Sequence, residues 1–124
     1  MAITVALVED NQDLRMGTSF VLRSSPSVEV VGAFETAEEL VDSFEDIRPD
    51  VVLMDIELPG MSGIEATAIL KKEHPHVQIV MLSVYEDDEN VFQAICAGAC
   101  GYVAKPVMPA QVIDLVEQAF GGSS

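Results

Sequence analysis

Residues 51–63 read VVLMDIELPGMSG: four apolar residues, an aspartate, and then a turn sequence that contains Pro59-Gly60. A continuous apolar run rich in Val and Ile suits a parallel strand that is buried on both faces. Ser62, with Glu65 three residues later, forms the capping-box pattern that opens a helix. The stretch therefore predicts a buried strand over Val51–Met54, which ends at Asp55 and leads through a turn into a helix.

The same strand-to-helix pattern repeats along the chain. Apolar runs predict four more strands, and periodic apolar positions predict helices after each of them. The strands are expected over Thr4–Val8, Val28–Phe34, Ile79–Leu82 and Tyr102–Ala104, and the other helices over Asp13–Arg23, from Thr36, over Asp87–Ala97 and from Pro109. Right-handed crossovers then give an α/β, doubly wound (βα)5 fold, whose five-stranded parallel sheet has the order 2-1-3-4-5 and helices on both faces.

Burial can also be predicted from these patterns. The helix over Asp87–Ala97 is expected to turn Val91, Phe92 and Ile95 toward the core. Cys96 and Cys100 lack a metal-binding or CxxC spacing, and they are interpreted as small buried residues in a reducing cytosol.

Composition limits the classes of function. The chain has 124 residues, 49% of them hydrophobic, which suits one domain with a proper core. Its net charge is −15, with only six Lys and Arg, which argues against direct binding of nucleic acid or of anionic membranes. No apolar run approaches the roughly 18 residues of a membrane span. We expect a cytoplasmic domain over residues 1–120, with 121–124 as the start of a linker or tail, and partners that are cations or basic protein surfaces.

Polar groups follow four of the predicted strands. Glu9-Asp10 follows the first, Asp55 the third, Ser83 the fourth and Lys105-Pro106 the fifth. In the order 2-1-3-4-5 these four strands are neighbours, and ligands of such sheets bind beyond the carboxyl ends of the strands. The pattern predicts a functional site at this edge.

The residue types at this edge indicate phosphoryl chemistry. Three carboxylates close together repel one another, and a hard divalent cation relieves the repulsion. We expect Mg²⁺, with Mn²⁺ as an alternative, to be held by Glu9, Asp10, Asp55 and the backbone carbonyl of Glu57, with Lys105 as a positive charge on the other side. Asp55 suits a nucleophile that forms an aspartyl phosphate, and Ser83 could then hydrogen-bond the phosphoryl group.

Each of these residues also has a purely structural interpretation. Glu9 and Asp10 could cap the first helix, and Ser83 could cap the helix after the fourth strand. Asp55 could be a turn residue, and Lys105 could be solvated. His74 and His76 are expected to be exposed loop residues. The structural interpretations together require four coincidences at one sheet edge.

The motifs resemble those of receiver domains from bacterial two-component response regulators, which have the CheY-like fold. The resemblance rests on residues 8–11 (VEDN), 54–63 (MDIELPGMSG), 82–85 (LSVY), 97–102 (AGACGY) and Lys105-Pro106. The stretches 82–90 and 98–102 are closest to receivers that precede a LuxR-type helix-turn-helix output domain. One departure is Val84, where receivers often have a small residue, so access to Asp55 could be narrower.

The resemblance implies a phosphorylation-dependent switch. Asp55 would accept a phosphoryl group from a sensor histidine kinase, with Ser83 and Lys105 contacting that group. Tyr102 would be an aromatic switch residue, and Lys105-Pro106 would be joined by a cis peptide bond. The domain would catalyse only its own phosphorylation and dephosphorylation, would form homodimers on phosphorylation, and would control transcription through a C-terminal DNA-binding domain absent from this chain.

Two other classes of function share the aspartyl phosphate chemistry or the fold. A haloacid-dehalogenase-like phosphatase also forms an aspartyl phosphate, but its nucleophile follows the first strand, a second nearby Asp acts as acid and base, and it usually has a cap segment. Here the nucleophile is expected after the third strand, position 57 is Glu, and no cap segment is expected. A flavin-binding electron carrier needs a hydroxyl- and glycine-rich loop after the first strand, where this chain has Glu9-Asp10-Asn11-Gln12-Asp13. The place of Asp55 therefore disfavours the phosphatase, and the acidic loop disfavours the electron carrier.

Overall fold

In the computed structural model, residues 2–84, 88–105 and 107–121 are described, and within them five strands alternate with five helices. The strands are β1 (Ile3–Val8), β2 (Val28–Phe34), β3 (Val51–Asp55), β4 (Gln78–Ser83) and β5 (Gly101–Ala104). The helices are α1 (Gln12–Arg23), α2 (Ala37–Ile47), α3 (Gly63–Glu73), α4 (Asp88–Ala97) and α5 (Pro109–Gly121). Predicted and observed ends agree within one residue wherever both are described.

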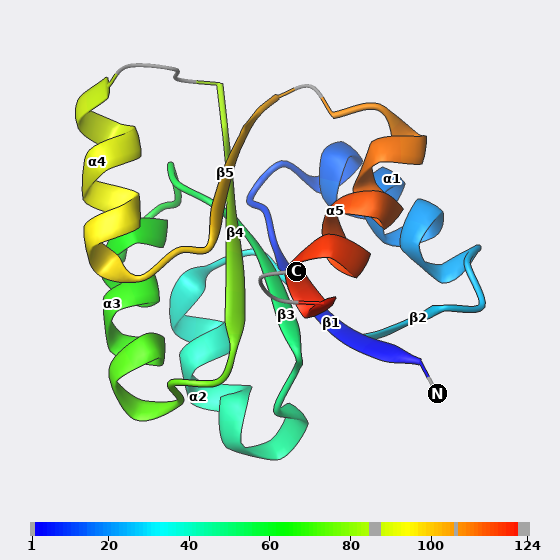
Figure 1. Ribbon diagram of the computed structural model, residues 1–124, viewed down its shortest axis with the longest axis horizontal. Coiled ribbons are helices and arrows are strands. Elements are labelled where there is room, and N and C mark those ends of the chain that lie inside the picture. Colours follow the sequence, from blue (N-terminus) through cyan, green and yellow to red (C-terminus); the bar gives the residue numbers. More distant parts are fainter. Residues whose placement is uncertain (1, 85–87, 106, 122–124) are drawn as a thin grey trace.

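The five strands form one parallel sheet in the order β2-β1-β3-β4-β5, which confirms the predicted topology (Figure 1). All residues of the central strand β3 are buried, as its unbroken apolar run predicts. β5 lies at the sheet edge, and each of its residues is only partly buried.

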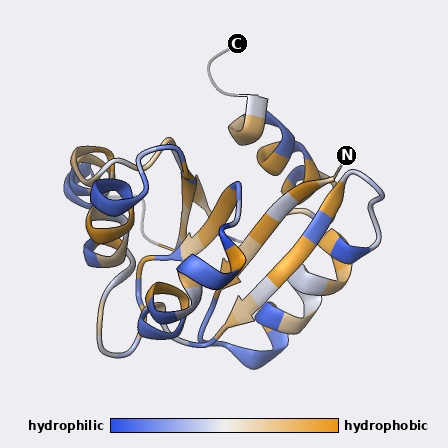
Figure 2. Ribbon diagram, turned by 90° about the horizontal axis from the view of Figure 1, so that it is seen from below, coloured by the Kyte–Doolittle hydropathy of each residue, from blue (hydrophilic) through white to orange (hydrophobic). Residues whose placement is uncertain are grey.

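Alternate residues of the strands pack against two different helix layers, because successive side chains of a strand point to opposite faces. Val5 and Leu53 contribute to the core beneath α1 and α5, where Leu22 and Val116 are fully buried. Met54 contributes to the other core, beneath α2, α3 and α4. Figure 1 shows α1 and α5 on one side of the sheet, and Figure 2 shows the apolar strands between the helix layers.

Both predicted capping boxes are present. At the start of α2 the Thr36 hydroxyl accepts a hydrogen bond from the Glu39 N–H at 3.2 Å, and the Glu39 carboxylate accepts one from the Thr36 N–H at 3.1 Å. Ser62 and Glu65 make the same reciprocal pair at the start of α3. These caps satisfy backbone N–H groups that have no partner inside the helix.

The orientation of α4 differs from the prediction. Phe92 and Ile95 are 67% and 58% exposed, whereas Ala94 is fully buried. Helical spacing places apolar residues on two neighbouring stripes of α4, and the stripe with the small Ala94 is the one that packs against the core. The prediction for the cysteines is also wrong, because Cys96 and Cys100 are both exposed.

Some predictions involve residues at the margins of the described chain. Asp87, expected as the first residue of the fourth helix, lies outside the described residues, as do 122–124 of the predicted tail; Gly121 is the last residue of α5. Within the described ranges, none of the helices has the length and apolarity that crossing a membrane requires.

Candidate functional site

The carboxyl ends of β1, β3, β4 and β5 bring the predicted site residues to one edge of the sheet. Asp55 is the last residue of β3 and pairs with Leu82 of β4, next to Ser83. Ser83 pairs with Ala104 of β5, next to Lys105. The strand register therefore places Asp55, Ser83 and Lys105 in sequence across the edge, as the topology predicts.

Glu9, Asp10 and Asp55 form the acidic cluster that the sequence predicts. One carboxylate oxygen from each of the three lies within 4.8 Å of the others. Glu9 and Asp55 are only 5% and 7% exposed, whereas Asp10 is exposed. The cluster therefore combines two shielded carboxylates with one that is open to solvent, and oxygen ligands in this arrangement fit a hard divalent cation.

Lys105 lies closer to the acidic cluster than we expected. We predicted a positive charge across the site from the carboxylates, but Nζ donates to Glu9 Oε1 at 2.5 Å and to Asp55 Oδ2 at 3.1 Å. The backbone N–H of Lys105 donates to the Ser83 carbonyl at 2.8 Å, which ties the lysine to the end of β4. Lys105 is therefore the cation that bridges the two buried carboxylates.

Backbone N–H groups hold the other oxygens of these carboxylates. Asn11 N–H donates to Glu9 Oε2 at 3.1 Å, and Glu57 N–H donates to Asp55 Oδ1 at 3.2 Å. The N-cap of α1 is Asn11, whose side chain accepts from Leu14 N–H at 3.0 Å. The alternative that Glu9 or Asp10 caps this helix is therefore wrong, and both remain available to the site.

Burial and charge act on the ionisation of the cluster in opposite directions. Burial is the largest influence on Asp55; together with the charge of Glu9 it outweighs the effect of Lys105 and raises the pKa of Asp55 from 3.8 to about 6. Burial also acts to raise the pKa of Glu9, but the hydrogen bonds from Lys105 and Asn11 hold it below its usual value. Burial disfavours the charged lysine, yet the two carboxylates raise the pKa of Lys105. Asp55 is thus the carboxylate whose charge is least well compensated.

A cavity of about 270 Å³ opens over these groups and is lined by Glu9, Asp10, Asn11, Leu14, Asp55, Glu57, Ser83, Val84 and Lys105. Ser83 is 1% exposed, so the serine that lines this cavity is buried. Val84, at the position where receivers often have a small residue, is 65% exposed and borders the cavity.

Two further predictions concern Tyr102 and the bond between Lys105 and Pro106. Tyr102 is partly buried and packs on the core beneath α2, α3 and α4, on the strand next to Met81. Its role as a switch residue stays a prediction. Pro106, the second residue of the expected cis peptide bond, lies outside the described residues.

Two residues that shape the site had not been assigned a role from the sequence. A Cβ atom on Gly63 would lie 2.2 Å from the backbone carbonyl oxygen of Asp55, so α3 begins there only because glycine has no side chain. Arg15 Nη1 donates to the backbone carbonyl of Glu9 at 2.8 Å. The one available signal for Arg15 is a cation in the first turns of a helix, where the helix dipole disfavours it.

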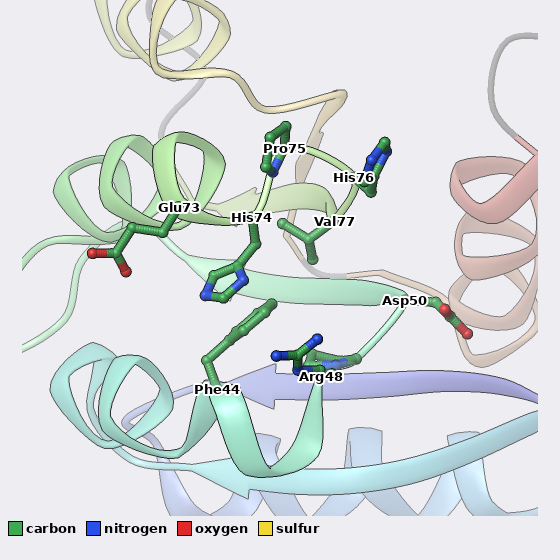
Figure 3. Close-up of a pocket in the computed structure, with 9 residues that line it drawn as sticks. Phe44, Arg48, Asp50, Glu73, His74, Pro75, His76 and Val77 are labelled. Carbon is green, nitrogen blue, oxygen red and sulfur yellow. The ribbon is translucent and has the colours of Figure 1, made fainter.

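A second cavity, of about 330 Å³, lies at the amino ends of β3 and β4, at the opposite end of the strands from the acidic cluster (Figure 3). His74 is not simply exposed as expected: its ring stacks on Phe44 with centroids 4.2 Å apart, and its Nε2 lies 3.4 Å from Glu45 Oε1. His76 is exposed. In the part of the chain that the structure describes, the acidic trio at the other end of the strands is the one group of three such ligands that could hold a metal ion.

Known proteins resemble this chain over almost its whole length. The family model described as "Response regulator receiver domain" matches residues 5–117. The response regulator protein VraR of Staphylococcus epidermidis is 32% identical over 124 residues, which are 100% of this chain and 59% of that protein. The chain thus spans little more than half the length of this relative.

Solved structures agree with the sequence comparison. The signal receiver domain of the response regulator NarL from Mycobacterium tuberculosis has a TM-score of 0.93 and 26% identity, over 98% of both chains. A two-component response regulator of the LuxR family from Aurantimonas sp. SI85-9A1 has a TM-score of 0.91 and 30% identity, over 98% of this chain and 87% of that one.

Proposed function

Because this chain belongs to the response regulator receiver domain family, whose members are phosphorylation-dependent signalling domains, we propose that Asp55 is its phosphoryl-accepting residue. The observation that carries the proposal is the place of Asp55: buried at the end of β3, bound by Lys105, and within 4.8 Å of two further carboxylates. A shielded aspartate whose charge is incompletely compensated suits a nucleophile that works beside a cation.

The residues of the site fit a divalent cation. Receiver domains generally bind Mg²⁺ at an acidic pocket, and Glu9, Asp10 and Asp55 bring three carboxylates together at such a pocket. We assign these three residues, with the backbone carbonyl of Glu57, to the binding of Mg²⁺ or Mn²⁺. When bound, the ion supplies positive charge that offsets the charge on the phosphoryl oxygens.

The chain's own residues would divide the transfer step among them. A carboxylate oxygen of Asp55 attacks the phosphorus of a phosphohistidine on the kinase; the new O–P bond forms, the P–N bond breaks, and the departing imidazole nitrogen takes a proton. The Lys105 ammonium group would shift its hydrogen bond from the Asp55 carboxylate to a phosphoryl oxygen, and Ser83 would donate to another phosphoryl oxygen. Hydrolysis of the acyl phosphate by water would reverse the modification. The domain is regulatory, and these self-directed steps are the only chemistry that we assign to it.

We further propose how the signal leaves the site. A phosphoryl group adds about −1.5 to −2 charges beside Ser83, which would draw that end of β4 toward Asp55. Tyr102, on the neighbouring strand, would reorient in response. The exposed apolar residues Phe92 and Ile95 of α4 offer a surface for homodimers of the phosphorylated protein. A coupling of ~1–3 kcal/mol changes such an affinity about 5–150-fold.

The output of the whole protein is also a proposal, since the relatives are longer than this chain. LuxR-type neighbours favour transcriptional control through a DNA-binding domain that follows the receiver, joined to it by a linker that starts after α5. The proposal includes a sensor histidine kinase as donor and a cytoplasmic location.

Intact-mass spectrometry tests the assignment of the phosphoryl acceptor. The protein is incubated with acetyl phosphate and Mg²⁺, and we expect one added phosphoryl group that is absent from Asp55→Asn and absent when EDTA replaces Mg²⁺. Asp42→Asn, which changes an exposed aspartate of α2, is the matched control and should be modified normally. Persistence of the adduct in Asp55→Asn would refute the assignment. Turnover of phosphate esters would favour the phosphatase alternative.

A further inference from the structure

We propose that Arg15 is a positioning residue for the cation site: its guanidinium holds the backbone carbonyl of Glu9 and thereby sets the place of Asp10. The inference rests on the proposed function, because it concerns the same acidic cluster. The contact is short, 2.8 Å from Arg15 Nη1 to Glu9 O. That carbonyl belongs to the planar peptide group that joins Glu9 to Asp10, so holding it restricts the orientation of Asp10.

Glu9 and Asp10 differ in what else holds them. Glu9 has direct restraints: its N–H donates to Phe34 O at 3.0 Å, and its two carboxylate oxygens accept from Lys105 and Asn11. Among the described residues, the Asp10 carboxylate accepts no hydrogen bond, and Asp10 is exposed. The position of its oxygen within the cluster therefore depends on its backbone, and the Arg15 contact acts on the peptide group that precedes it.

Helix stability does not account for an arginine at this position. Arg15 follows the N-cap Asn11 by four residues, and its N–H makes the first hydrogen bond of the helix, to Asn11 O at 2.9 Å. A cation so close to the helix start opposes the dipole, whereas Arg23 in the last turn is favoured by it. Side chains of a helix lean toward its N-terminus, so an arginine here reaches back over the loop between β1 and α1.

The hydrogen bond from Arg15 to the Glu9 carbonyl does not neutralise any carboxylate of the site. Within the described ranges, Arg15 makes no ion pair within 4.0 Å of a carboxylate, whereas Lys105 makes two. A guanidinium is always charged, so its effect at a distance is to repel a second cation. Arg15 consequently has two opposed effects on Mg²⁺: its charge disfavours the ion, and its hydrogen bond arranges the ligands. Removal of Arg15 reveals which effect is larger.

The test measures Mg²⁺ affinity by isothermal titration calorimetry for the parent protein, Arg15→Met, Arg15→Lys and Arg23→Gln. Outer residues that orient metal ligands typically contribute 10–100-fold to affinity, so we expect Arg15→Met to bind Mg²⁺ about 10-fold more weakly. Arg15→Lys keeps the charge and one donor that can reach the carbonyl, and it should recover part of the loss. Arg23→Gln removes the same charge from the far end of α1, and it should bind Mg²⁺ as tightly as the parent or slightly more tightly.

The direction of the change separates positioning from charge alone. If Arg15 acted only through its charge, Arg15→Met would bind Mg²⁺ more tightly, and that result, or an unchanged affinity, would overturn the inference. Thermal unfolding confirms that each variant is folded. Should Arg15→Met not fold, Arg15→Ala takes its place, because it removes the same charge and the same donors; an Arg15→Ala variant that binds Mg²⁺ as tightly as the parent, or more tightly, refutes the inference. A parent that binds no Mg²⁺ overturns the cation site and the role of Arg15 together, whereas a parent that binds with Arg15→Met unaffected overturns only the latter.

Discussion

Replacement of Asp55 by asparagine should stabilise the metal-free protein above about pH 6. The ionised Asp55 carboxylate is buried, lies near the negative charge of Glu9, and is only partly compensated by Lys105. Asparagine has nearly the shape of the protonated carboxyl group and carries no charge. The folded protein therefore no longer has to shield a charge that the unfolded chain exposes to water.

The size and pH dependence of the effect follow from the pKa. A rise from 3.8 to about 6, at about 1.4 kcal/mol per pH unit, corresponds to about 3 kcal/mol. Between these two values the unfolded chain has released the Asp55 proton while the folded protein retains it, so the contribution of Asp55 to the free energy of unfolding falls as the pH rises through this window. The advantage of Asp55→Asn should thus be close to zero below about pH 4 and reach about 3 kcal/mol above about pH 7.

Urea unfolding in EDTA, followed by far-UV circular dichroism across this pH range, measures the difference between the two proteins. Asp42→Asn is the matched control, because it removes one negative charge from an exposed site in a chain of net charge −15. Millimolar Mg²⁺ should narrow the difference, since an ion that binds the folded parent stabilises it. An advantage that is the same at about pH 4 and about pH 7, or an Asp55→Asn variant that is less stable than the parent at both, would refute this account of the site.

Three further variants test how the fold supports the site and its surface. Gly63→Ala should destabilise by about 2 kcal/mol or more in urea unfolding, because its Cβ would lie 2.2 Å from the Asp55 carbonyl oxygen; a neutral result would show that α3 can shift. Thr36→Ala should lower the free energy of unfolding by about 1 kcal/mol through loss of the α2 capping box, and an unchanged melting temperature would contradict that role. Phe92→Ser should change stability by no more than about 0.5 kcal/mol, because Phe92 is 67% exposed, whereas a core phenylalanine would cost about 3 kcal/mol or more. The same variant should weaken self-association of the phosphorylated protein in sedimentation velocity, and unaltered association would remove α4 from the proposed dimer surface.

The order of elements and the membership of the site could be predicted from the sequence. The apolar run Val51–Met54 has the composition of a strand buried on both faces, and it ends directly at Asp55. Four such runs that end in polar residues place those residues at one sheet edge once the order 2-1-3-4-5 is inferred. These features are local or topological, so they depend on residue type and spacing alone.

Relations between side chains from distant segments required the tertiary structure. Lys105 donates to both Glu9 and Asp55, 96 and 50 residues away, and no spacing in the sequence indicates that it bridges them. The sequence also does not determine which stripe of α4 faces the core, because Phe92 and Ile95 have the helical spacing of a buried face. In the structure the small Ala94 is buried instead, which lets the helix pack closely. The hydrogen bond from Arg15 to the Glu9 carbonyl depends on how α1 leaves β1. Sequence periodicity specifies which residues can be apolar neighbours, whereas the packing of the helices on the twisted sheet determines which of them meet.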